Sequence, residues 1–127
     1  HTKKAIQSIQ RIVNVFSPHQ QPQIPQLLSF VLQGVVSQQL IPKSNGPGRA
    51  MAMEILIPNN AIRNLIREDK VHQIYSSMQA GQNESGMMTM NQSLQRLAQA
   101  KMLSKAAAIE HSPVPDELTK LLAGVKD

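Results

Sequence analysis

Two arginines, Arg63 and Arg67, form the pattern in this sequence that most suggests a binding function. They are four residues apart in a predicted helix, so they share one side of it, where like charges destabilise a helix by about 0.2–0.5 kcal/mol. Arg63 also lies near the N-terminal, positive end of the helix dipole. These two small penalties suggest that the pair faces an anionic partner. A solvated face of an amphipathic helix has the same pattern and remains the alternative.

The helix that carries these arginines is predicted from residues 59–68. Pro58 ends the extended run before it, and Asn60 is the predicted N-cap. Apolar residues then recur at helical spacing on one arc: Ala61, Ile62, Leu65 and Ile66. We expect this arc to hold the helix to the core, which leaves Arg63, Asn64 and Arg67 available to a partner.

Other side chains that could do chemistry are too dispersed to form a site on their own. The histidines lack the spacing of paired metal ligands; they are His1, His19, His72 and His111. The sequence has no cysteine and no GxxxxGKS/T phosphate loop. The glycine-containing stretch 45–48 has no lysine and hydroxyl at the required spacing and leads into a predicted strand. The sequence therefore predicts no metal site and no complete nucleotide site.

Two helices are predicted in the first part of the chain. Residues 2–16 form the first, because apolar residues recur there at steps of three and four: Ile6, Ile9, Val13 and Phe16. A polar link with three prolines follows, and Pro25 is expected in the first turn of the next helix, where its missing amide costs nothing. From Leu27 a broad apolar stripe predicts the main core helix; it comprises Leu27, Leu28, Val31, Leu32, Val35 and Val36.

A β-hairpin is predicted next, from strands at residues 38–42 and 49–57. The turn-forming residues 43–48 between them give a six-residue loop. In the second strand, large residues alternate with smaller or charged ones, so the large ones share a face. The large residues are Met51, Met53, Ile55 and Ile57, and Ala50, Ala52 and Glu54 alternate with them.

Short helices are predicted for the rest of the chain. One begins near His72 and carries Val71, Ile74, Tyr75 and Met78 on its apolar side; residues 81–86 after it are a candidate mobile loop. Thr89 and Gln92 have the spacing of a capping box, Ser104 caps an alanine-rich helix, and residues 115–122 form a last helix. We expect a domain part at residues 1–112 and a tail at residues 113–127.

The composition is typical of a globular chain, because 41% of the 127 residues are hydrophobic and 17% are charged. The net charge of +5 could attract nucleic acid, but the longest basic run is Lys3 and Lys4, and aromatic content is only 2%. Nucleic acid is therefore not an expected partner. No apolar stretch reaches the roughly 20 residues that cross a bilayer. We expect a cytoplasmic protein without a transmembrane segment, and a start at His1 indicates a piece of a longer protein.

Two alternatives come from other classes of protein. The charge of +5 and the helix with Arg63 and Arg67 would also suit a small basic helical module that binds nucleic acid. An interaction scaffold with no enzymatic parent is the second alternative. Steep loss of affinity with added salt would support the first, and a phosphate loop in the upstream sequence would exclude the second.

Three stretches resemble one known family. Residues 61–68 read AIRNLIRE, which resembles the signature of the PilT-family twitching-motility ATPases, the motors that retract type IV pili. Residues 34–40 (GVVSQQL) and 88–94 (MTMNQSL) agree with the same family in order and spacing. His1 and Thr2 resemble the end of its histidine box. The resemblance covers nearly the whole chain and fades after Ser104. Related type II secretion ATPases commonly carry a four-cysteine zinc element in this region, which a chain without cysteine does not have.

The resemblance implies an α/β fold class, as the C-terminal half of a RecA-like P-loop ATPase domain that is here mostly helical with one β-hairpin. It implies ATP and Mg as cofactors of the longer parent, with no cofactor for this chain alone, which we expect to be inactive by itself. It also implies a homo-hexamer that works with the inner-membrane pilus machinery, in the cytoplasm and peripheral to that membrane.

The resemblance also implies roles for particular residues. His1 matches the histidine that responds to the terminal phosphate of the nucleotide, although Lys3 and Lys4 replace the family's Asn-Ser. Arg11 matches a basic position in the family's helix, and we expect it to face nucleotide or a neighbouring subunit. The signature helix implies that motor coupling, the transfer of ATP-driven motion to partners, depends on Arg63, Asn64, Arg67 and Glu68.

Overall fold

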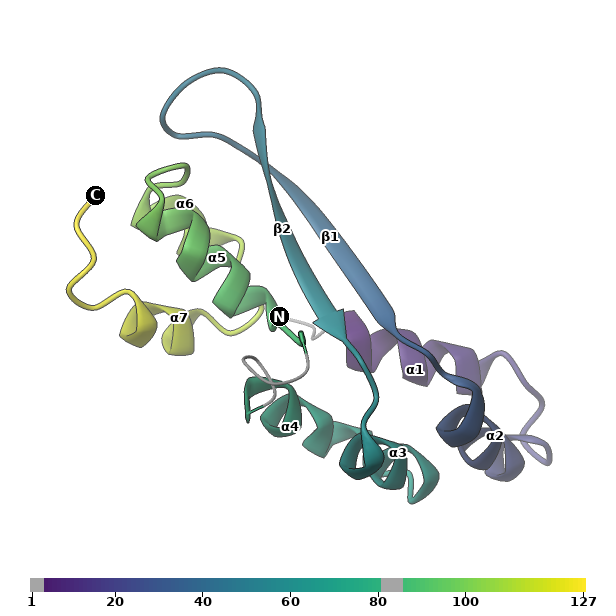
Figure 1. The fold of residues 1–127 in the computed structure, drawn as a ribbon. Coiled ribbons are helices and arrows are strands. Elements are labelled where there is room, and N and C mark those ends of the chain that lie inside the picture. Colours follow the sequence, from purple (N-terminus) through teal and green to yellow (C-terminus); the bar gives the residue numbers. More distant parts are fainter. Residues whose placement is uncertain (1–3, 81–85) are drawn as a thin grey trace.

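A computed structural model describes residues 4–80 and 86–127 of the chain. Helices flank one hairpin (Figure 1). The first half contains α1 (Lys4–Asn14), the 3-10 turn η1 (Gln21–Gln23), α2 (Ile24–Val31), β1 (Val35–Pro42) and β2 (Arg49–Leu56). The second half contains α3 (Asn60–Arg67), the 3-10 turn η2 (Val71–Gln73), α4 (Ile74–Ala80), α5 (Met90–Gln99), α6 (Lys105–Glu110) and α7 (Pro115–Leu121). Among the described helices, none has the length and apolar character that a membrane span needs.

The hairpin packs against α1 and against α5 (Figure 1). β1 and β2 are antiparallel, with Val35 opposite Leu56 and Pro42 opposite Arg49, so the predicted six-residue loop is confirmed. β1 begins at Val35, three residues earlier than predicted. Outside the hairpin, Met88 pairs with Ile55 of β2 through two backbone hydrogen bonds of 2.8 and 3.0 Å. This pairing brings the chain back to β2 just before α5.

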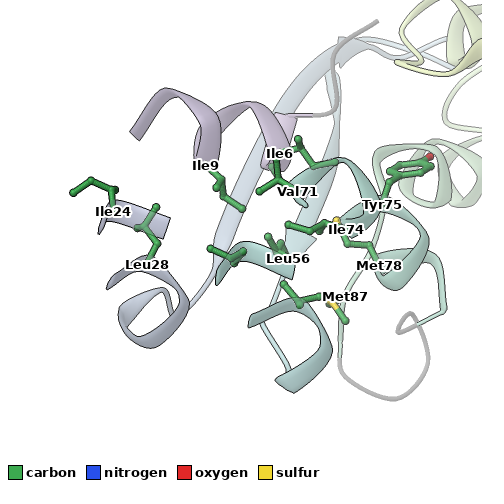
Figure 2. Packing of buried hydrophobic residues seen from close by; sticks show 13 residues of the cluster. Ile6, Ile9, Ile24, Leu28, Leu56, Val71, Ile74, Tyr75, Met78 and Met87 are labelled. Carbon is green, nitrogen blue, oxygen red and sulfur yellow. The ribbon is translucent and has the colours of Figure 1, made fainter. Parts of the chain in front are cut away.

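The first hydrophobic core lies between α1, α2, α3 and α4 (Figure 2). Leu56, at the end of β2, is fully buried in it. Its helices contribute apolar side chains at helical spacing; the buried residues include Ile6, Ile9, Ile24, Leu28, Ile62, Ile66, Val71, Ile74, Tyr75 and Met78. The predicted apolar side of the helix at residues 71–80 is thereby confirmed.

The second hydrophobic core lies between the loop half of the hairpin and α5, α6 and α7. Its members include Ile41, Ala50, Ala52, Leu94, Ala98, Leu103, Ala108, Leu118 and Leu122. The predicted caps are confirmed, because Thr89 and Gln92 form a capping box at α5 and the Ser104 side chain accepts a hydrogen bond at the start of α6. Leu118 and Leu122, from the segment predicted as a tail, are both buried in this core.

The structure corrects the prediction that the main core helix begins at Leu27. α2 begins at Ile24 and ends at Val31, with Pro25 in its first turn as predicted. Leu27 is 58% exposed and Val31 62% exposed, while Val35 and Val36 belong to β1. The apolar stripe was too broad for one short helix to bury, because α2 packs mainly on α3 and leaves its other side uncovered. At Gly34 the chain passes so close to the Leu56 carbonyl oxygen that an added Cβ would lie 3.2 Å from it.

Alternation in β2 is confirmed, but the face with the small residues is the buried one. Ala50, Ala52, Glu54 and Leu56 are at most 1% exposed, whereas Met51 is 44% exposed. Small side chains on this face allow α5 to pack closely against the strand. The first helix is also shorter than predicted, since it ends at Asn14 and leaves Phe16 39% exposed beyond it.

Candidate functional site

The N-cap of α3 is one residue earlier than the sequence predicts. Asn59, not Asn60, is the N-cap, and its side-chain oxygen accepts a 2.9 Å hydrogen bond from the Ile62 amide. Both asparagines could serve, and extended backbone at Asn59 (ψ −176°) decides between them. Ile62 and Ile66 are fully buried as predicted. Leu65 is half-buried and Ala61 is exposed, so the arc that holds α3 is narrower than predicted.

Arg63 is directed at the neighbouring helix. Its Nη1 donates a 2.9 Å hydrogen bond to the backbone carbonyl of Ser29, in the last turn of α2. That carbonyl is one of those that an α-helix leaves without an internal partner, at the negative end of the dipole. Arg63 is half-buried. The expectation that its side chain remains freely available is therefore wrong, because Arg63 joins α3 to α2; its part in motor coupling stays a prediction.

The other three predicted coupling residues are exposed. Glu68 forms an ion pair with Lys70, at 3.4 Å between Oε2 and Nζ, and both side chains are more than half exposed. Asn64 and Arg67 lie on the solvent side of α3. Within the described residues Arg67 makes no ion pair. Arg67 is therefore the cation of this helix that a partner could reach.

Arg67 and Glu68 line a cleft of about 850 Å³ between the end of α3 and the first two helices. Apolar residues of α1 and the proline-rich link form much of the remaining wall; they include Ile9, Val13, Pro18, Pro22 and Pro25. Asp69 and His72 also line it. The cleft combines apolar surface with charged side chains of both signs.

Of the two residues predicted to reach nucleotide, the structure describes only Arg11. Arg11 is exposed on α1 and is not among the residues that line the cleft. His1, the other predicted nucleotide residue, lies outside the described residues, as does most of the candidate loop at residues 81–86. Within the described ranges, no group of three histidine or acidic side chains could hold a metal ion.

A polar network between the two cores was not anticipated from the sequence. The Tyr75 hydroxyl donates a 2.7 Å hydrogen bond to Glu117 Oε2. Gln79 and Asn91 donate to the same carboxylate, and Ser112 donates to Asn91. The network joins α4, α5 and α7. A tyrosine on an apolar helix side was the available signal, since a buried hydroxyl needs a partner, but the partner is 42 residues away.

Burial changes the acidity of the network's tyrosine. Desolvation, and then the hydrogen bond to the Glu117 carboxylate, raise the pKa of Tyr75 well above its ordinary value of 10.0. Nearby Glu54 adds to this effect through its charge. The phenol is thus held in its neutral, hydrogen-donating form.

A second unanticipated contact lies at the start of α1. Glu54 of β2 is 1% exposed, and its Oε1 accepts a 2.6 Å hydrogen bond from the backbone amide of Ala5. Helix α1 has no acidic residue in its own first turn. The strand therefore supplies a hydrogen-bond acceptor to this helix end. The only signal in the sequence was the place of this acidic residue in the alternating pattern, on the same strand face as Ala52 and Leu56.

The chain is similar in sequence to known proteins. No model of a known protein family matches the chain. It is 45% identical over 108 residues to a twitching motility protein of Neisseria gonorrhoeae, which covers 85% of this chain. It is 43% identical over 116 residues to the type IV pilus retraction ATPase PilT of Pseudomonas aeruginosa, which covers 91% of it. The chain spans 29% and 33% of the lengths of these two relatives.

Two solved structures match the fold of the chain. A crystal structure of the pilus retraction motor PilT with bound ADP matches with a TM-score of 0.79 and 49% identity, over 91% of this chain and 32% of that one. The ATPase DotB of Legionella pneumophila matches in fold alone, with a TM-score of 0.65 and 15% identity, over 98% of this chain and 30% of that one. The predicted fold class is confirmed by these matches. In sequence and in fold, the chain matches PilT-type twitching-motility proteins, over about a third of their length.

Proposed function

We propose that the chain works as part of an ATPase that powers type IV pilus retraction. The observation that carries this proposal is the 43% identity to a pilus retraction ATPase over 91% of the chain, together with the fold match to a retraction motor. In this proposal, ATP is hydrolysed by the longer protein, and this chain passes the resulting motion to neighbouring parts. The longer protein would act as a homo-hexamer in the cytoplasm, peripheral to the inner membrane and in contact with the pilus machinery there.

The nucleotide would bind mainly to parts of the longer protein outside this chain. The sequence has no phosphate loop, and the described residues offer no carboxylate and histidine cluster for Mg. The solved relative with bound ADP supports use of a nucleotide by the longer protein. From this chain, His1 and Arg11 are the residues proposed to reach it. An exposed guanidinium on α1 fits that role, because arginine binds phosphate oxygens in a bidentate manner.

Motor coupling is assigned to the exposed side of α3. Arg67 and Glu68 stand at the cleft, and Asn64 lies one helical turn before Glu68 on the exposed surface. Arg63 would contribute differently, by holding α3 against the last turn of α2 through the Ser29 carbonyl. A force on the exposed side of α3 would then move α3, α2 and the first core together.

The test compares two exposed arginines in the full-length protein. Arg67→Ala should leave ATP turnover and melting temperature close to wild type, since surface changes alter stability by about 0.5 kcal/mol or less. Pilus retraction, measured by twitching motility, should fall strongly. Arg96→Ala is the matched control, because Arg96 is an exposed arginine on α5, away from the cleft. Normal twitching by Arg67→Ala would return this surface to the solvated-face alternative.

A further inference from the structure

The polar network around Glu117 is a feature to which the proposed function gives no role. The Glu117 carboxylate accepts hydrogen bonds from Tyr75 and Gln79 of α4 and from Asn91 of α5. Glu117 itself belongs to the first turn of α7. Among the described residues it forms no ion pair, so neutral donors satisfy its charge. Three helices therefore meet at one carboxylate.

The buried side chain of Asn91 fixes the chain segment that carries Glu117. Asn91 is 0% exposed. Its Nδ2 also donates a 3.0 Å hydrogen bond to the Val114 carbonyl, and its Oδ1 accepts a hydrogen bond from Ser112. The Ser112 hydroxyl in turn accepts a 3.0 Å hydrogen bond from the Val114 amide. Because a buried polar network with its bonds satisfied rigidifies its surroundings, the start of α7 is held in one position on α5.

The network forms a second attachment between the two cores. The hairpin is the first, because Leu56 of β2 lies in the first core and Ala50 and Ala52 lie in the second. Two bodies joined through a single element can still rotate about it in a hinge motion. Tyr75 is on α4, which packs on α3 and η2, and Glu117 is on α7, which packs on α5 and α6. A bond between these two helices lies outside the hairpin and therefore opposes that rotation.

The first core connects this attachment to the proposed coupling helix. Tyr75 is 8% exposed and belongs to the same core as Ile62 and Ile66 of α3. We propose that Glu117 is a positioning residue for motor coupling: by binding Tyr75 and Gln79, it makes the second core move together with α3 and α4. The inference rests on the proposed role of α3 in motor coupling. A displacement of α3 then reaches α7 through α4 as well as through the hairpin.

The first measurement follows the distance between the two cores in the longer protein that contains this chain. The chain has no cysteine, and Ser76 of α4 and Gln99 of α5 are exposed. Spin labels on Ser76→Cys and Gln99→Cys, with any upstream cysteine replaced, therefore report this distance. Its distribution should become about twice as wide in Glu117→Ala, because both bonds to α4 are lost and the hinge is released. Glu117→Gln, which keeps one acceptor oxygen, and Tyr75→Phe, which loses one hydroxyl, should widen it less.

The second measurement compares twitching motility with ATP turnover at matched protein levels in the cell. In Glu117→Ala, twitching should fall about fivefold or more while kcat for ATP stays within about twofold of wild type, because the change affects a conformational step and not the nucleotide site. Glu117→Gln should twitch better than Glu117→Ala. A merely structural role would lower twitching only through the amount of folded protein, which the matched levels remove.

Gln95→Ala is the matched control. Gln95 of α5 donates a 3.3 Å hydrogen bond to the Leu121 carbonyl of α7, so this variant also removes a bond to α7, but one within the second core. Its distance distribution and its twitching should match those of the wild type. If Gln95→Ala widens the distribution or lowers twitching as much as Glu117→Ala, the inference is wrong.

Arg67→Ala separates the two possible failures. If Arg67→Ala impairs twitching while the Glu117 and Tyr75 variants keep a wild-type distance distribution or wild-type twitching, the inference is wrong and the proposed role of α3 stands. If Arg67→Ala twitches normally, the proposed role of α3 fails and the inference fails with it. If Glu117→Ala does not fold, Tyr75→Phe decides by the same comparisons, because it removes only a hydroxyl.

Discussion

Arg63 and Arg67 differ in their surroundings although they are four residues apart on one helix. Arg63 is half-buried and donates a hydrogen bond to the Ser29 carbonyl, while Arg67 is exposed at the cleft. The like-charge penalty in the sequence is thus partly explained by an intramolecular acceptor for one of the two. The prediction of an anionic partner from outside therefore concerns only Arg67.

The two arginines should therefore respond differently to truncation. Arg63→Ala is expected to destabilise the fold by about 1 kcal/mol, because it removes a hydrogen bond and leaves a buried residue's carbonyl without that donor. Arg67→Ala should change stability by about 0.5 kcal/mol or less. Urea unfolding of the two variants measures this difference. Equal stabilities would show that the Arg63 contact contributes nothing.

Tyr75 makes the stability of the chain depend on pH at the alkaline end. Its pKa is raised in the folded state, so the folded chain keeps a proton that the unfolded chain loses near pH 10.0. The contribution of the neutral phenol is complete below that pH, and stability should fall as the pH rises above it. Tyr75 is the sole tyrosine in the sequence, so its phenolate absorbance reports the titration directly. Glu117→Gln should move this titration back toward pH 10, and a wild-type titration at its ordinary position would contradict the prediction.

At the scale of elements, α3 is held by signals at both of its ends. Asn59 caps its start. At its end the amide of Asp69 bonds to the Ile66 carbonyl and the amide of Lys70 to the Leu65 carbonyl, with Asp69 in the left-handed region at φ 57°. This is the usual αL termination of a helix, with aspartate where glycine is most common. Local hydrogen bonds therefore define both the first and the last residue of this short helix.

The caps of α3 can be tested with adjacent asparagines. Asn59→Ala should destabilise the chain by about 1 kcal/mol, because the Ile62 amide loses its acceptor. Asn60→Ala is the matched control and should have almost no effect, since Asn60 is exposed at the first helical position. Thermal unfolding of both variants gives the comparison. A larger loss of stability in Asn60→Ala than in Asn59→Ala would indicate that Asn60 is the N-cap, as the sequence predicts.

At the scale of the whole molecule, the hairpin joins two separate cores and leaves one of its faces uncovered. Leu40 and Met51 are paired across the strands and are 57% and 44% exposed. Exposed apolar residues continue at Val36 of β1 and at Leu27 and Phe30 of α2. Large exposed apolar areas are uncommon on monomeric proteins. We expect this surface to be covered when the chain is part of the longer assembly proposed above.

The chain produced by itself should consequently self-associate as its concentration rises. Light scattering should report an average mass that increases with concentration, because burial of the hairpin face stabilises the contact. Leu40→Lys should reduce this association. Leu121→Lys, at an exposed leucine of α7, should not. A monomer at every accessible concentration would contradict the prediction.

Features that depend on residues close together in the chain could be predicted from the sequence. The capping box at Thr89, the cap at Ser104 and the hairpin loop were all predictable, because each involves groups within a few residues of one another. The family was equally readable, since AIRNLIRE is a contiguous signature at residues 61–68. The buried sides of α3 and α4 followed from helical spacing.

Which surfaces meet could be learned only from the folded chain. The bond from Arg63 to Ser29 spans 34 residues, that from Tyr75 to Glu117 spans 42, and that from Glu54 to Ala5 spans 49. A periodic pattern shows that an element has an apolar side, but not whether another element covers it. For that reason the stripe from Leu27 predicts a longer and more deeply buried helix than α2. Burial is a property of the packed neighbours, and these become adjacent only when distant parts of the chain fold against one another.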